Sequence, residues 1–169
     1  MDSSTLLYLA PLAGLLSLVF AGIFAKSVLK NDPGTPEMQE IAGAIQEGAM
    51  AYLNRQYKTI AIVAVILAVI IFIALPKENS LNMKTTIGFL AGAVSSALAG
   101  YIGMNVSVRS NVRTANKAKE GLKEAMEVAF KGGAVTGMAV VGLALLGTSG
   151  FFIPFASTPE SVDMVIGFG

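Results

Sequence analysis

The sequence has no cysteine, no histidine and no tryptophan, and it is poor in charged residues. Without cysteine the chain can form neither a disulfide nor a reactive thiolate. Without histidine it lacks the commonest metal ligand and the commonest general base near neutral pH. Charged residues make up 14 % of the chain and hydrophobic residues 54 %, whereas a soluble domain carries about 25 % charged residues. This composition predicts an integral membrane protein.

Motifs of soluble enzymes are missing as well. No Gly-Lys-Ser or Gly-Lys-Thr occurs, so the chain has no P-loop for nucleotide phosphates. Aspartate occurs only as Asp2, Asp32 and Asp163, whereas magnesium–phosphate chemistry needs carboxylates that converge on the metal. We therefore expect no catalytic, cofactor-binding or metal-binding residue in this chain, and no nucleic-acid partner.

Four long apolar stretches are present instead, each near the roughly 20 residues that a helix needs to cross a bilayer. They predict spans at about 6–28, 59–75, 86–108 and 132–153, with links at 29–58 and 109–131 on one side of the membrane. No charged residue lies deep within a span, and since intramembrane charges mark ion pathways, we do not expect a conduction path here. The predicted fold class is an all-α integral membrane protein, a single membrane region with four transmembrane helices and amphipathic extensions.

Both links contain amphipathic segments. Asn31–Gly34 predicts a turn, and Thr35 and Pro36 are typical of a helix N-cap and a first helical residue. A helix starting there should run unbroken into the second span, and its apolar face comprises Met38, Ile41, Ala42, Ile45, Ala49, Tyr52 and Leu53. In the other link we place a turn at 109–113 and a new helix from Thr114 into the fourth span. Its predicted apolar face comprises Ala115, Ala118, Leu122, Ala125, Met126 and Ala129.

Small residues recur four apart in three of the spans, which places them on one helix face where another helix can approach closely. The sets are Ala13, Ser17, Ala21 and Ala25; Gly88, Gly92, Ser96 and Gly100; and Gly133 with Gly137. We predict that these faces pack against other helices. The alternatives are chance glycine enrichment, which is common in membrane helices, and a simple lipid-facing anchor for the first span.

Lysine and arginine are unevenly distributed between the two sides of the membrane. The two long links and the adjoining end of the first span hold Lys26, Lys30, Arg55, Lys58, Arg109, Arg113, Lys117, Lys119, Lys123 and Lys131. The opposite link holds only Lys77 and Lys84. The positive-inside rule then predicts cytoplasmic links and both termini outside. Because Asp2 precedes the first apolar run and the lysines follow it, we expect no secretory signal peptide.

Arg109, Arg113 and Lys117 lie at four-residue intervals and would form one basic ridge at the membrane surface if they were helical. Such a ridge could bind anionic phosphate or lipid headgroups. The alternative, which we favour, is that these side chains reach toward the interface and set the topology.

Three runs carry a resemblance to a known family. EGAMAYLNRQYKTI (Glu47–Ile60), GYIGMNVSVRSNVRTA (Gly100–Ala115) and AFKGGAVTGMAVVGLALLG (Ala129–Gly147) resemble the N-terminal part of membrane-bound, ion-pumping inorganic pyrophosphatases. The resemblance covers almost the whole chain. It implies a homodimer with two concentric rings of membrane helices per subunit, in which the first four helices belong to the outer ring. It also implies a prokaryotic cell membrane as the location.

The resemblance further implies magnesium-dependent hydrolysis of pyrophosphate, coupled to export of protons or sodium ions, with a potassium requirement left open. In the family the pyrophosphate-binding aspartates and lysines begin on the fifth helix, and this sequence ends where that helix opens. No catalytic or metal-binding residue can therefore be carried over to this chain, which we expect to be inactive alone. It would be a truncated product, a broken gene or one piece of a longer protein.

Two function classes follow. The first is the structural outer helices of a pyrophosphate-energised pump, with the bilayer and the remaining pump helices as partners. The second is a non-enzymatic membrane scaffold or small transporter subunit that pairs with another chain.

Overall fold

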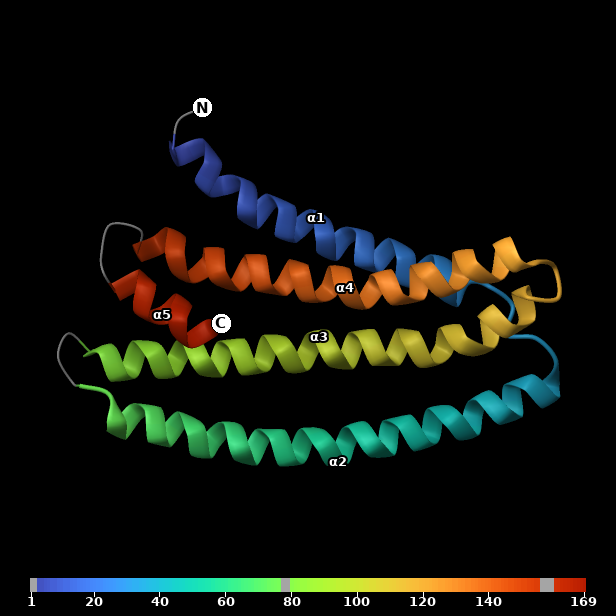
Figure 1. Cartoon of the computed structure of the whole chain (residues 1–169), viewed down its shortest axis with the longest axis horizontal. Coiled ribbons are helices and arrows are strands. Elements are labelled where there is room, and N and C mark those ends of the chain that lie inside the picture. The colour runs from blue at the N-terminus through green and yellow to red at the C-terminus, as the bar shows by residue number, and fades with distance from the viewer. Residues whose placement is uncertain (1–2, 77–79, 156–159) are drawn as a thin grey trace. The chain divides into compact units, whose positions relative to one another are not determined.

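The computed structural model describes residues 3–76, 80–155 and 160–169, and every regular element among them is helical (Figure 1). The elements are α1 (Ser3–Leu29), α2 (Pro36–Ala74), α3 (Leu81–Lys117), α4 (Leu122–Phe152), the 3-10 helix η2 (Ile153–Phe155) and α5 (Glu160–Phe168). The helices α1, α2, α3 and α4 are long and apolar enough to cross a membrane. The predicted all-α membrane fold is confirmed, whereas the membrane borders of the spans stay a prediction.

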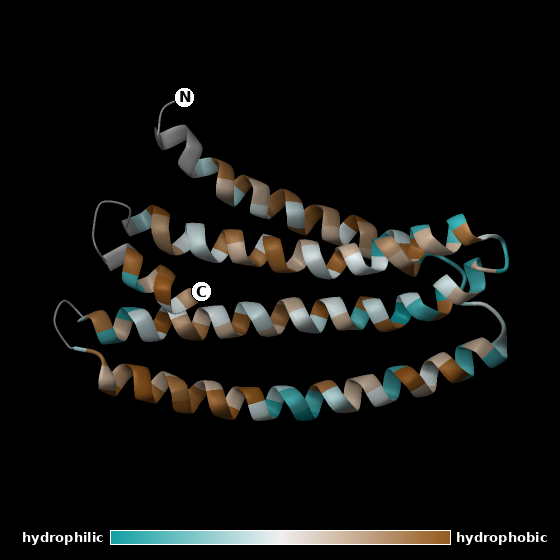
Figure 2. Cartoon of the chain, viewed as in Figure 1, coloured by the Kyte–Doolittle hydropathy of each residue, from teal (hydrophilic) through white to brown (hydrophobic). Residues whose placement is uncertain are grey.

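The chain divides into two compact units. The first unit holds residues 1–16, 57–98 and 141–169, and the second holds residues 17–56 and 99–140. Most of the charged residues belong to the second unit. Figure 2 shows the hydrophilic residues gathered near the α1–α2 loop, near the α3–α4 turn and in the middle of α2.

The loop between α1 and α2 has the predicted turn and helix cap. Gly34 has a φ of 88°, a left-handed conformation that glycine adopts without strain, and its N–H donates to Asp32 Oδ1 over 2.9 Å. The Met38 N–H donates to Thr35 Oγ1 over 3.4 Å, and α2 begins at Pro36. The cap at Thr35 is therefore confirmed, and so is the unbroken helix that follows it.

The turn predicted at 109–113 is wrong, and so is the helix start near Thr114. The α3 helix continues to Lys117, a turn occupies residues 118–121, and α4 begins at Leu122. No glycine or proline interrupts 109–113, and Ser110 Oγ donates to the Ser107 carbonyl within the helix over 2.7 Å. Gly121 is the one poor helix former in the region, and the Gly121 N–H bonds back to the Lys117 carbonyl over 3.2 Å. Ala115 and Ala118 consequently do not share a helix with Leu122.

Residues 77–79 of the link between α2 and α3 lie outside the described residues, and so does Pro159. At its described end Ser80 has a φ of 58°. The buried Asn82 Nδ2 then donates to the Phe72 carbonyl over 3.1 Å. This bond joins the start of α3 to the last turns of α2, where helix carbonyls lack intrahelical partners.

Apolar side chains cover much of the helix surfaces. Only 6 % of the most apolar stretch of α2 is buried, against 17 % of the most apolar stretch of α1. In the second unit the predicted apolar face of α2 is only partly covered. Ala42 and Leu53 are buried, whereas Ile41 is 64 % exposed.

Candidate functional site

Glycines bring α5 unusually close to α3 and α4 within the first unit. A methyl group added at Gly88 would collide with the Met164 carbonyl oxygen, and one added at Gly92 would collide with the Phe168 carbonyl oxygen. A methyl group at Gly147 would collide with the Phe168 ring, which also packs on Phe151 with 5.7 Å between ring centroids. We call Gly88, Gly92 and Gly147 the glycine seat of α5.

A larger residue in place of Gly88 or Gly92 would displace α5. At Gly88 and Gly92 the neighbouring atoms belong to the α5 backbone, which cannot rotate away as a side chain can. The contact is mutual, because a methyl group at Gly167 of α5 would collide with the Thr85 carbonyl oxygen of α3. Close approach of helix backbones through small residues is the usual way in which membrane helices associate.

The other residues predicted to pack against helices have environments that differ from those of Gly88 and Gly92. Ser96 is exposed and Gly100 is half-buried. A Cβ atom added at Gly133 or Gly137 would meet no atom of the described chain within 4 Å beyond its own helix backbone and chain neighbours. Packing of other helices against these residues stays a prediction.

Sequence reasoning missed a neighbouring stripe that does pack. In the second unit a methyl group at Gly103 would lie 2.5 Å from Thr136 Oγ1, and one at Gly132 would lie 2.6 Å from Ser110 Oγ. Gly132 and Thr136 are themselves four residues apart, so a second small-residue stripe lay one position before Gly133 and Gly137. The spacing alone could not decide which of the two adjacent stripes meets α3.

The predicted small-residue face of α1 contacts α4. Ser17 Oγ donates to the Met138 carbonyl over 2.8 Å and Ala21 is buried, both in the second unit. In the first unit a methyl group at Gly14 would lie 3.0 Å from Leu146 Cγ. The interpretation of α1 as a simple lipid-facing anchor is therefore wrong.

The three residues of the predicted basic ridge are all helical, at the end of α3, but they have different environments. Arg109 is exposed. Arg113 is half-buried, and it donates from Nε to the Asn31 carbonyl over 3.0 Å and from Nη1 to the Arg109 carbonyl over 2.7 Å. Burial and the neighbouring Arg109 charge lower the pKa of Arg113. Lys117 instead pairs with Glu120 at 2.8 Å, and this hydrogen bond raises the pKa of Lys117.

Arg113 therefore serves as a clamp on the α1–α2 loop. Besides its bond to Asn31, the neighbouring Asn116 Nδ2 donates to the Asp32 carbonyl over 3.3 Å. The Asn31 side chain turns back on α1 and donates to the Ser27 carbonyl over 2.8 Å. The α1–α2 loop is thus tied to α3, and the Asn31 side chain ties the loop to the end of α1.

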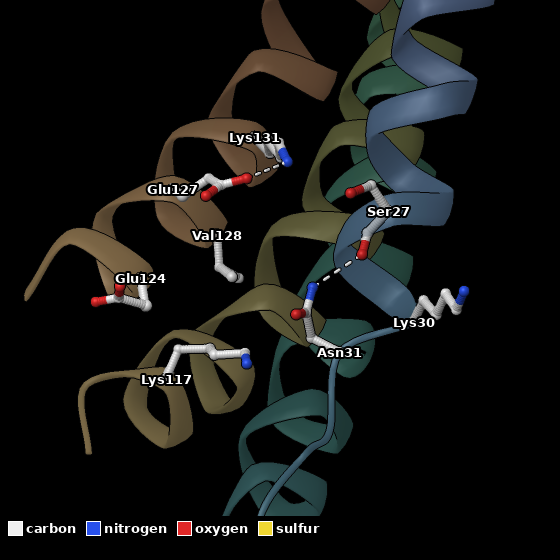
Figure 3. A pocket seen from close by; sticks show the side chains of 8 residues that line it. All are labelled: Ser27, Lys30, Asn31, Lys117, Glu124, Glu127, Val128 and Lys131. Atoms are coloured by element: carbon white, nitrogen blue, oxygen red, sulfur yellow. Dashed lines mark hydrogen bonds and ion pairs between the residues drawn. The ribbon is translucent and has the colours of Figure 1, made fainter. Parts of the chain in front are cut away.

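Lys117 also lines a polar pocket of about 410 Å³ in the second unit (Figure 3). The lining residues are Ser27, Lys30, Asn31, Lys117, Glu124, Glu127, Val128 and Lys131. Lys131 Nζ pairs with Glu127 Oε1 at 2.5 Å, which lowers the pKa of Glu127. Within the described ranges no group of three or more histidine, cysteine, aspartate or glutamate side chains is placed to hold a metal ion.

Comparisons with known proteins agree on one family. The family model described as inorganic H+ pyrophosphatase matches residues 15–169. A K(+)-insensitive pyrophosphate-energized proton pump of Methanosarcina mazei is 56 % identical over 164 residues, which cover 97 % of this chain and 23 % of that protein. A second such pump, of Moorella thermoacetica, is 48 % identical over 94 % of this chain and 23 % of its own length.

A relative from Bacteroides thetaiotaomicron carries a provisional name as a K(+)-stimulated pyrophosphate-energized sodium pump. It is 39 % identical over 89 % of this chain and 20 % of its own length. The chain thus spans less than a quarter of the length of these curated relatives.

Proposed function

We propose, because this chain belongs to the inorganic H+ pyrophosphatase family, that it supplies outer membrane helices of a pyrophosphate-energised cation pump. In this proposal the assembled pump hydrolyses pyrophosphate with magnesium and exports a cation, and this chain positions the helices that carry the chemistry. The names of the Methanosarcina and Moorella relatives favour protons over sodium ions. We further propose a homodimer in a prokaryotic cell membrane, with cytoplasmic basic links and both termini outside.

The observation that carries the proposal is the glycine seat. Two glycines of α3 meet the backbone of α5, and one glycine of α4 meets the Phe168 ring of α5. The family resemblance makes α5 the opening of the helix on which pyrophosphate binding begins. A seat of this kind fixes the position of a helix without contributing a reactive group. The open faces at Gly133 and Gly137 would receive further helices of the pump.

A chimeric pump tests this role. The matching region of the Methanosarcina mazei pump, which is 56 % identical over 164 residues, is replaced by this chain. We expect pyrophosphate-dependent proton uptake into inverted vesicles close to that of the parent. In the chimera, Gly92→Val should abolish uptake, because the larger side chain displaces α5. Gly43→Val should preserve it, because Gly43 is exposed and an added Cβ there meets no described atom within 4 Å beyond its own helix backbone. Uptake that survives Gly92→Val would contradict the proposal.

Hydrolysis by this chain alone gives a second test. Membranes that contain only these 169 residues should release no phosphate from pyrophosphate above the background of empty membranes. Clear magnesium-dependent release would show that the chain itself carries catalytic residues.

A non-enzymatic scaffold or transporter subunit is the second candidate, and the open faces at Gly133 and Gly137 suit it equally well. Affinity purification from native membranes separates the two. Co-purification of a pyrophosphatase remainder favours the pump, and recovery of this chain with itself alone favours an independent oligomer.

A further inference from the structure

The polar pocket of the second unit has features of a binding site for a small ligand that carries both a positive and a negative charge. Its volume of about 410 Å³ lies within the range of about 300–1,000 Å³ of small-molecule sites. In Figure 3 the ammonium groups of Lys117 and Lys131 extend into the space between α4 and α1, whereas Lys30 extends away from them. The two lysines come from the end of α3 and from α4, so the fold brings them together.

These ammonium groups retain unused hydrogen-bond donors. Each lysine has three N–H protons. Lys131 is paired with one oxygen of Glu127, and Lys117 with the two carboxylate oxygens of Glu120. A phosphate group between the lysines would accept the remaining protons in charge-assisted bonds.

The same pocket also contains negative charge, which disfavours a plain anion. Glu124 and Glu127 line it from α4. Among the described residues none forms a hydrogen bond or a close ion pair with Glu124, although the Glu124 charge contributes to the raised pKa of Lys117. A ligand that carries an ammonium group as well as a phosphate would satisfy this carboxylate and the lysines together.

Exposed apolar residues one helical turn or less from the pocket point to a lipid as the source of that ligand. Ile23 precedes Ser27 by four residues on α1 and is 53 % exposed, and Phe130 adjoins Lys131 on α4 and is 76 % exposed. Charged side chains beside such apolar surface occur where membrane helices meet phospholipid headgroups.

We propose that this pocket binds the phosphoethanolamine headgroup of a membrane phospholipid. Lys117 and Lys131 hold the phosphate, Glu124 with Glu127 holds the ammonium group, and the acyl chains lie along the exposed surfaces of α1 and α4. The proposal rests on the proposed function only for the orientation of the basic links toward the cytoplasmic leaflet.

Native mass spectrometry of the full chain in detergent tests the site. The chain is titrated with phosphatidylethanolamine, with phosphatidylcholine, whose ammonium group has no proton to donate, and with phosphatidylglycerol, which has no ammonium group. We expect phosphatidylethanolamine to be retained preferentially. Lys117→Gln and Lys131→Gln should each lower its retention about tenfold, the loss of one charge-assisted contact. Glu124→Gln should lower phosphatidylethanolamine retention and leave phosphatidylglycerol retention unchanged.

Lys123→Gln is the matched control, since Lys123 is an exposed lysine of α4 that does not line the pocket. It should leave retention unchanged, and Lys117→Arg should largely restore what Lys117→Gln removes, which separates loss of the site from loss of the fold. Equal retention of the three lipids, or an equal effect of Lys123→Gln, would overturn the proposal. Displacement of the lipid by equimolar inorganic phosphate would also overturn it, because the site would then bind a free anion. These outcomes do not depend on uptake by the chimeric pump, so either proposal can fail without the other.

Discussion

Glycine has two opposite roles in this chain, and the surroundings of each residue determine which one applies. At Gly88 and Gly92 an added methyl group would meet the backbone of α5, whereas at Gly133 and Gly137 it would meet no atom of the described residues within 4 Å beyond its own helix backbone. The four-residue spacing is the same in both pairs. Sequence spacing therefore predicts candidate contact positions, but only the three-dimensional arrangement shows which glycines are in contact.

Alanine substitutions should separate the two roles. Gly133→Ala should stabilise the chain by roughly 0.5–1 kcal/mol, because alanine favours the helix and restricts the unfolded state. Gly92→Ala should destabilise it by about 1–3 kcal/mol through overpacking against α5. Thermal unfolding of the full chain in detergent, followed by circular dichroism, measures both. Equal shifts of the same sign would contradict the distinction.

Arg113 and Arg109 form a second contrasting pair. Arg113 donates to two backbone carbonyls, whereas Arg109 is exposed. Arg113→Met should destabilise the chain by about 1–3 kcal/mol, because the part-buried Asn31 carbonyl loses its donor. Arg109→Met should change stability by no more than about 0.5 kcal/mol. Chemical unfolding of the two variants under matched conditions gives the comparison, and similar losses would show that Arg113 is not a clamp.

At the scale of elements, the sequence predicted the start of α2 but neither the end of α3 nor the start of α4. Thr35 and Pro36 have side-chain chemistry that determines a helix start, and α2 begins there. At 109–113 charged and polar residues suggested a turn, but these residue types also continue a helix when their side chains bond to its backbone, as Ser110 does. Gly121 was the better signal. The packing of α5 on α3 could not be predicted, because the final apolar residues gave no indication of their partner.

The position of the α3–α4 turn can be tested by insertion. Gly-Ser inserted after Glu120 should cost less than about 0.6 kcal/mol, because it lengthens an existing loop. The same insertion after Asn111 interrupts α3 and moves Arg113 and Asn116 away from the α1–α2 loop, so it should cost more than about 2 kcal/mol. Unfolding measurements on both variants decide the matter. A smaller loss of stability from the insertion after Asn111 would support a turn at 109–113.

At the scale of the whole molecule, the distribution of charge predicts which ends of the helices face the cytoplasm. The natural sequence lacks cysteine, so single cysteine substitutions can be labelled without background. Met83→Cys at the start of α3 should react with a membrane-impermeant maleimide in intact cells. Glu120→Cys in the α3–α4 turn should react only after permeabilisation. Both residues are exposed, so the opposite labelling pattern would invert the topology.

The glycine seat also has a consequence for the order in which the protein is made. Chains are synthesised from the N-terminus, so α3 and the Gly147 region of α4 leave the ribosome before α5 does. The residues that receive α5 can therefore be inserted in the bilayer before α5 is translated. α5 would then pack against a surface of α3 and α4 that is already formed, and the earlier helices would act as a template for the membrane insertion of those that follow.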